Sequence, residues 1–150
     1  MSDPPHGRVV NDVLARAIYN SEGEFFGGAV YLFLGSTLNA NMTLDASNAD
    51  YTFYGINGQG YLGRHLASAG DVDGDGLDDL LVGAERSDAA GKAYLILGSS
   101  LGSSSTIDLS SADYSFIGEN TNDSAGYSLS SAGDVDGDGY GDTVAPTDGF

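Results

Sequence analysis

An all-β fold assembled from repeated units is predicted by three observations on this sequence. The chain aligns with itself at an offset of 63 residues, and short apolar runs bounded by Gly, Ser, Asn or Asp recur along it. No segment keeps the 3.6-residue period of a helix over a helical length. The chain has 150 residues, of which 41% are apolar, so one domain with a core of its own is expected.

The internal repeat is clearest in the second half of the chain. Ser68–Gly76 matches Ser131–Gly139 without a mismatch, and residues 45–79 share 20 of 35 positions with residues 108–142. Towards the N-terminus an offset of 67 lays Asn11–Ala17 on Asp78–Ala84 in a more degenerate copy. We therefore divide the chain into a degenerate repeat (1–48), a complete repeat (49–111) and a partial repeat (112–150).

Each repeat is predicted to form short strands, because its apolar runs are rich in Tyr, Phe, Val, Leu and Ile. The candidates are Ala29–Leu34, Asp50–Tyr54, Leu77–Gly83, Ala93–Leu97 and Asp113–Ile117. Four short antiparallel strands per unit of this size are typical of one blade of a β-propeller. A 63-residue period gives this chain about 2.4 units, whereas propellers close with roughly 4–8 blades. The prediction is therefore a partial β-propeller.

Two Asp-rich loops, Asp71–Asp79 and Asp134–Asp142, are the candidate metal sites. Carboxylates at positions 1, 3, 5 and 9 and the carbonyl of position 7 supply the hard oxygens that Ca²⁺ prefers, and the intervening glycines allow the loop to curl. The predicted ligands are Asp71, Asp73, Asp75, Leu77, Asp79, Asp134, Asp136, Asp138, Tyr140 and Asp142. Carboxylates this close repel one another without a cation, so the loop conformation is expected to depend on calcium.

An EF-hand is excluded for both loops. Position 12 would need a bidentate Glu, but it is Val82 in the first loop and Ala145 in the second. A metal-free Asp/Gly turn is the alternative, and the exact duplication disfavours it. The second site has weaker support, because Pro146 falls where the strand after the loop should continue. In the degenerate repeat Pro4–Val10 takes the place of the loop without its acids, so a third site is not expected.

The stretch Gly63–Ala84, followed by Ala93–Gly98, resembles the FG-GAP repeat. That resemblance implies blades of the seven-bladed β-propeller found in integrin α subunits and bacterial surface proteins. It also implies calcium bound by the Asp loop between neighbouring strands. Leu62-Gly63 stands in place of the family's Phe-Gly, and Gly83-Ala84-Glu85 in place of its Gly-Ala-Pro. The absence of cysteine favours a prokaryotic relative over an animal integrin.

Charge and composition restrict the partners. With 22 acidic and 5 basic residues the net charge is -17, which disfavours nucleic acid and anionic membranes and favours divalent cations. No run approaches the roughly 18–20 apolar residues of a membrane span, so membrane insertion is not expected. Residues 1–10 do not read as a signal peptide. The resemblance nevertheless implies an extracellular or cell-surface location.

The leading functional hypothesis is a calcium-binding extracellular β-propeller repeat module with a structural or adhesion role. Its expected partners are calcium ions and a protein or glycan adhesion partner, with self-association through open blade edges also expected. No nucleophile–base pair is recognisable, so the chain is not expected to be an enzyme. The alternative is a non-catalytic repeat fragment of a larger secreted hydrolase.

Overall fold

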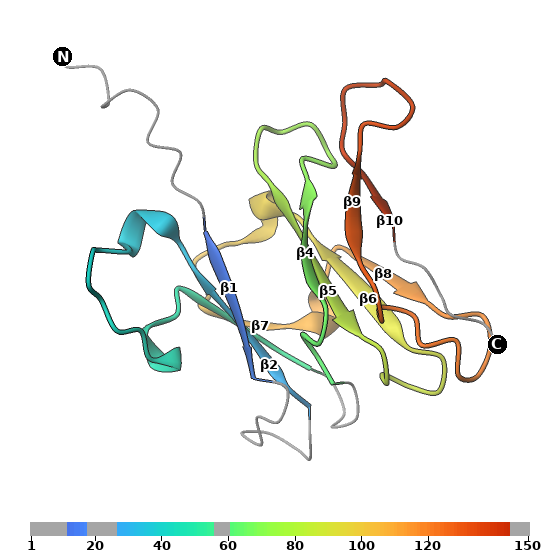
Figure 1. Cartoon of the computed structure of the whole chain (residues 1–150), viewed down its shortest axis with the longest axis horizontal. Coiled ribbons are helices and arrows are strands. Elements are labelled where there is room, and N and C mark those ends of the chain that lie inside the picture. The colour runs from blue at the N-terminus through green and yellow to red at the C-terminus, as the bar shows by residue number, and fades with distance from the viewer. Residues whose placement is uncertain (1–11, 18–26, 56–60, 145–150) are drawn as a thin grey trace.

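The computed structural model describes residues 12–17, 27–55 and 61–144 (Figure 1). Regular structure within these ranges consists of ten strands and four single-turn 3-10 helices, which confirms the all-β prediction. The strands are β1 (Val13–Ala17), β2 (Ala29–Phe33), β3 (Tyr51–Tyr54), β4 (Leu66–Gly70), β5 (Asp79–Ala84), β6 (Lys92–Ile96), β7 (Thr106–Asp108), β8 (Tyr114–Ile117), β9 (Ser130–Gly133) and β10 (Asp142–Val144). The 3-10 turns are η1 (Gly35–Thr37), η2 (Ala46–Asn48), η3 (Gly98–Ser100) and η4 (Leu109–Ser111).

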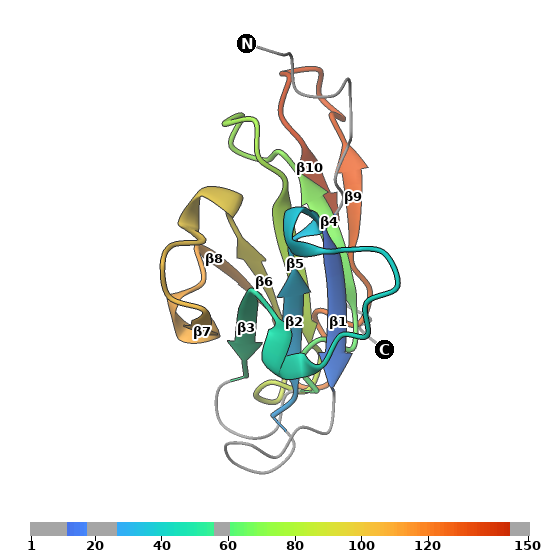
Figure 2. The same cartoon turned by 90° about the vertical axis from the view of Figure 1, so that its left-hand side faces the viewer.

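The strands form three sheets. The central sheet has the order β4-β5-β6-β8 and is antiparallel throughout, as expected for a blade. The first sheet has the order β1-β2-β3-β7, and the third contains β9 and β10. In the first sheet β7 runs parallel to β3, which departs from the antiparallel expectation (Figure 2). Closure of a propeller ring is not seen in these three sheets.

The register of the strands repeats with the offsets found in the sequence. Val13 pairs with Phe33 in the first sheet as Leu80 pairs with Ile96 in the central one. The irregularity that follows each Asp loop is also duplicated, because the β4–β5 pair is bulged beside Asp79 and the β9–β10 pair is bulged at the equivalent point. The degenerate N-terminal copy therefore folds like the complete one over its described part.

Five strands predicted from the sequence are present, with ends shifted by one or two residues. The strand expected at Leu77–Gly83 begins only at Asp79, because Leu77 still belongs to the Asp loop. The prediction did not include β4 and β9, whose Leu66–Gly70 and Ser130–Gly133 sequences are rich in Ser, Ala and Gly and have little intrinsic strand preference. They are strands because they pair with β5 and β10.

The strand after the second Asp loop is present, although the sequence indicated poor support there. Asp142–Val144 pairs with β9 over three positions. Pro146 and the Pro4–Val10 segment lie outside the described residues. The second loop therefore lies between two paired strands, which are shorter than the strands on either side of the first loop.

Two clusters of apolar side chains hold the sheets together. The larger one lies between the first and central sheets and includes the fully buried Phe53, Leu62 and Val82. The smaller one contains Ala69, Leu81 and Leu95, with Leu129 packed against it just before β9. Burial between adjacent sheets is the arrangement expected of neighbouring blades.

Glycines of the signature motif lie at the contacts between repeats. Gly63 has a φ of 78°, and a Cβ there would lie 2.5 Å from Cγ2 of Val30. The Gly63 N–H donates to the Gly83 carbonyl at 2.9 Å. A Cβ on Gly83 would lie 2.2 Å from the carbonyl oxygen of Gly126 in the next repeat. These positions therefore admit only glycine without a shift of the backbone.

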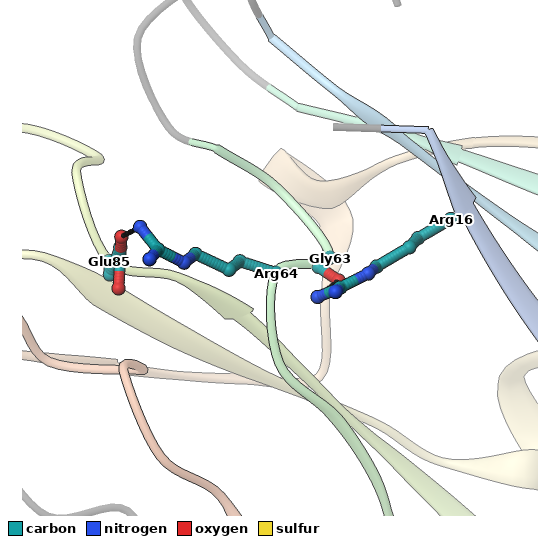
Figure 3. Close-up of polar contacts among 4 residues, drawn as sticks. All are labelled: Arg16, Gly63, Arg64 and Glu85. Atoms are coloured by element: carbon teal, nitrogen blue, oxygen red, sulfur yellow. Dashed lines mark hydrogen bonds and ion pairs between the residues drawn. The ribbon is translucent and has the colours of Figure 1, made fainter. Parts of the chain in front are cut away.

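Two arginines make polar contacts around Gly63, and one of them, Arg16, reaches across from the first sheet (Figure 3). Nη1 of Arg16, on β1, donates to the Gly63 carbonyl at 3.2 Å. The next residue, Arg64, forms an ion pair with Oε1 of Glu85, which lies immediately after β5. Glu85 is only 5% exposed, and among the described residues its Oε2 has no hydrogen-bond partner. The pair is therefore half solvated on the arginine side and buried on the carboxylate side.

Candidate metal centres

The first Asp loop is organised around the carboxylate of Asp71, the residue directly after β4. Its Oδ1 accepts hydrogen bonds from the N–H groups of Gly74 and Asp75, at 2.8 and 3.0 Å. Its Oδ2 accepts from the N–H of Gly76 at 2.9 Å. Gly74 and Gly76 have φ values of 75° and 88°. A side chain at either position would strain the curl that brings these donors to one carboxylate.

Two further carboxylates complete the cluster in this loop. Oδ1 of Asp75 accepts from the Leu77 N–H at 2.8 Å, and Oδ1 of Asp73 accepts from the Asp75 N–H at 3.2 Å. One oxygen from each of Asp71, Asp73 and Asp75 lies within 4.8 Å of the others. The alternation of Asp with Val or Gly thus aims three side chains at a common point, as the sequence predicted.

The role of Asp79 is different from that of the other three acids. It is fully buried, and it lies outside the carboxylate cluster. Its Oδ2 accepts from the Val72 N–H and its Oδ1 from the Gly98 N–H, both at 2.8 Å. Asp79 therefore ties the start of the loop to the turn after β6. Coordination by Asp79, and by the Leu77 carbonyl, stays a prediction.

The same anchoring survives in the degenerate repeat. Oδ1 of Asp12, which aligns with Asp79, accepts from the N–H of Gly35 at 2.8 Å, and Gly35 aligns with Gly98. The contact holds the start of β1 to the turn after β2, although the other loop acids are missing from the aligned sequence. This position is thus retained where no carboxylate cluster can form, which points to a structural use.

The second Asp loop repeats the first almost bond for bond. Asp134 accepts from the N–H groups of three residues at 2.8, 3.0 and 2.9 Å, and Oδ2 of Asp142 accepts from Val135 at 2.7 Å. Oxygens of Asp134, Asp136 and Asp138 lie within 4.8 Å of one another. All three of these residues are exposed, whereas Asp71 in the first loop is partly buried. Ligation by Asp142 and by the Tyr140 carbonyl stays a prediction.

The two loops are in direct contact, which the sequence analysis did not anticipate. The N–H of Gly141 donates to the Asp71 carbonyl at 2.8 Å. The ring of Tyr140 lies against Gly74, where a Cβ would come 2.0 Å from Cε1 of the ring. The equivalent glycine of the second loop, Gly137, has no heavy atom within 4 Å of an added Cβ. The two loops therefore share the same cluster of three acids and the glycines beside them, but a neighbouring side chain covers only the first loop.

The electrostatics of the loops favour a cation. Desolvation raises the pKa of Asp73 above its ordinary value of 3.8, and the charges of Asp75 and Asp79 add to this, against a backbone hydrogen bond from Asp75 that lowers it. The ion pairs of the described residues, Arg64–Glu85 and Lys92–Asp88, involve neither loop. Three converging carboxylates without a basic neighbour form a hard-oxygen donor set, which suits Ca²⁺. The residues present therefore fit a calcium ion.

Comparison with known proteins finds a family model that matches the part of the chain containing the first Asp loop. The model of the FG-GAP repeat matches residues 63–96, which run from the glycine at the first contact between repeats to the end of β6. Integrin alpha-PS2 of Drosophila melanogaster is 38% identical over 100 residues, covering 59% of this chain and 7% of that protein. The described residues contain no helix long and apolar enough to cross a bilayer. The chain therefore contains an FG-GAP repeat and is distantly similar to integrin alpha-PS2.

Proposed function

We propose that this chain is a calcium-binding repeat module of an extracellular β-propeller, with calcium stabilising the Asp-rich loops and with a structural or adhesion role. The observation that carries the proposal is the convergence of the Asp71, Asp73 and Asp75 oxygens, repeated at Asp134, Asp136 and Asp138. We assign the remaining ligands to Asp79, Asp142 and the carbonyls of Leu77 and Tyr140. Similarity to an integrin α chain supports the extracellular location and the adhesive role.

Calcium would act here as a structural clamp. The loop hydrogen bonds already hold the acids close together, so the ion would relieve their mutual repulsion rather than create the loop. Extracellular modules bind Ca²⁺ with Kd values of about 10⁻⁴–10⁻³ M. At about 2 mM calcium this corresponds to roughly 0.6–1.8 kcal/mol of stabilisation per site.

Thermal unfolding tests the proposal. The melting temperature is measured in calcium, in magnesium and in chelator, for the wild type and for Asp75→Ala and Asp138→Ala. We expect calcium to raise the wild-type melting temperature, magnesium to raise it less, and each variant to lose part of the calcium effect. A melting temperature that is the same in calcium and chelator would refute the proposal.

The alternative, a repeat belonging to a larger secreted hydrolase, gives the module the same calcium role. It differs in what the rest of such a protein would do. No arrangement among the described residues specifically favours it, so the structural module is the function we propose.

A further inference from the structure

The two Asp loops are held next to each other by the strands that carry them. β4 and β9, which lead into the first and second loop, contact each other between the second and third repeats. Leu129, just before β9, packs against the cluster that contains the buried Ala69 of β4 and Leu81 of β5. Figure 2 shows both loops extending from the same end of these strands. Packed apolar side chains therefore support the contact between the loops.

One peptide group, that between Tyr140 and Gly141, belongs to both loops. Its N–H, on Gly141, donates to the carbonyl of Asp71 at 2.8 Å. Its C=O, on Tyr140, is the oxygen that we assign to the ion of the second loop. Asp71 is also the residue whose carboxylate accepts from three backbone N–H groups of the first loop. The two ends of a single peptide dipole are thus used by the two candidate sites.

This peptide group can transmit the occupancy of one loop to the other. A cation on the Tyr140 carbonyl polarises the peptide, so the Gly141 N–H becomes a stronger donor to the Asp71 carbonyl. In the other direction, a first loop that its own ion holds in place keeps the Asp71 carbonyl in position, which orients the peptide for the second ion. Coupling between two binding sites has the same magnitude in both directions.

We propose that the Tyr140–Gly141 peptide couples the two loops, so that calcium bound in either loop raises the calcium affinity of the other. This inference rests on the proposed function, because both loops must bind the ion. A single hydrogen bond carries the coupling, so we expect a change in affinity of about two- to fivefold, at the lower end of the usual range for coupled sites.

Charge alone predicts coupling of the opposite sign. An occupied loop carries the added charge of Ca²⁺, so it attracts a second cation less strongly than an empty loop does. Salt screens this repulsion between exposed sites, whereas a backbone hydrogen bond is short-ranged and is affected less. Positive coupling that persists at high salt therefore identifies the hydrogen-bonded route.

Calcium titrations followed by NMR measure the two loops separately in the intact chain. The amide signals of Gly76 and Gly139, whose N–H groups donate to the central carboxylate of each loop, report the first and the second loop. Asp138→Ala disables the second loop and gives the affinity of the first alone, and Asp75→Ala does the reverse. With these two affinities fixed, one coupling factor of about two- to fivefold should fit both wild-type curves.

Gly141→Ala tests the peptide route. A Cβ at this position would lie 3.1 Å from the Ala69 carbonyl oxygen and 3.3 Å from the N and O atoms of Asp71, so it forces the loops apart. The loop itself accepts a side chain here, because the exposed Asp78 occupies this position in the first loop. Gly141→Ala should bring the coupling factor to one or below. Asp78→Ala, the matched control, and Tyr140→Leu both keep the peptide and should keep the coupling.

The outcomes distinguish this inference from the proposed function. If neither reporter amide responds to calcium, the proposed function fails and the inference fails with it. If both loops bind but the wild-type factor is one or less, or if the factor survives Gly141→Ala, the inference alone is overturned. Hydrogen exchange decides the matter if that variant does not fold. In Asp138→Ala, calcium in the first loop should slow exchange of the Gly141 N–H, and an unchanged rate overturns the coupling.

Discussion

The contact between the two Asp loops gives the sharpest prediction, a comparison of Gly74→Ala with Gly137→Ala. Both glycines occupy the fourth position of their loops, with φ values of 75° and 78°. Alanine therefore costs the same backbone strain at both, about 1–2 kcal/mol. Only at Gly74 does the new Cβ meet another group, because Cε1 of Tyr140 lies 2.0 Å from its ideal position.

The size of the difference follows from how Tyr140 can respond. Overpacking costs about 1–3 kcal/mol when neighbours cannot move. Tyr140 is 45% exposed, so its ring has room to move outward, which places the cost at the lower end. We expect Gly74→Ala to destabilise the protein by about 1 kcal/mol more than Gly137→Ala does.

Urea denaturation followed by tyrosine fluorescence measures both variants, since the chain has nine Tyr and no Trp. Tyr140→Leu, which copies the Leu77 of the first loop, should rescue Gly74→Ala and leave Gly137→Ala unchanged. The coupling energy of Gly74→Ala with Tyr140→Leu should exceed about 0.5 kcal/mol, as for residues in contact. A coupling energy near zero would show that the ring does not lie over Gly74 in solution.

Three other predictions follow from the sites. In chelator, Asp79→Asn should lower the free energy of unfolding by about 1–3 kcal/mol, because the side-chain amide cannot accept both backbone hydrogen bonds. Asp75→Asn should instead mainly reduce the rise in melting temperature that calcium causes. Arg64→Ala should lower the denaturation midpoint by leaving the buried Glu85 carboxylate unpaired, and adding Glu85→Gln should restore part of the loss. The raised pKa of Asp73 favours the calcium-free folded state below its unfolded value of 3.8, and this contribution is lost as pH rises through the folded pKa. The melting temperatures in chelator and in calcium should therefore diverge as the pH rises above 3.8.

The sequence predicted the features that are local or periodic. The spacing of Asp71, Asp73 and Asp75 was enough to place three carboxylates together, because loop geometry depends on neighbouring residues. The offsets of 63 and 67 also predict the strand register of the degenerate copy. Residues that are equivalent by these offsets pair with equivalent partners, as Val13 with Phe33 and Leu80 with Ile96. These inferences needed no knowledge of how the sheets lie against each other.

What the sequence missed depends on contacts between repeats. β7 contains three residues with no pattern of their own, and it is a strand because β3 offers an edge. The Ser- and Ala-rich β4 and β9 are strands for the same reason. The contact of Tyr140 with Gly74 depends on the relative position of two sheets, which no periodicity within one repeat encodes.

The inequality of the two Asp loops has a different cause from the one that the sequence suggested. A strand follows each loop, so a missing strand is not the cause. The second loop packs against the first, because the Gly141 N–H donates to the Asp71 carbonyl and the Tyr140 ring covers Gly74. An ion that stabilises the conformation of the second loop would therefore also stabilise the first loop. Because coupling between sites is reciprocal, an ion in the first loop would raise the calcium affinity of the second. Duplicated sequence thus gives two matching carboxylate clusters in unequal surroundings, and coupling between bound ions would pass through Tyr140 and Gly141, at positions 7 and 8 of the second loop, where the two copies differ.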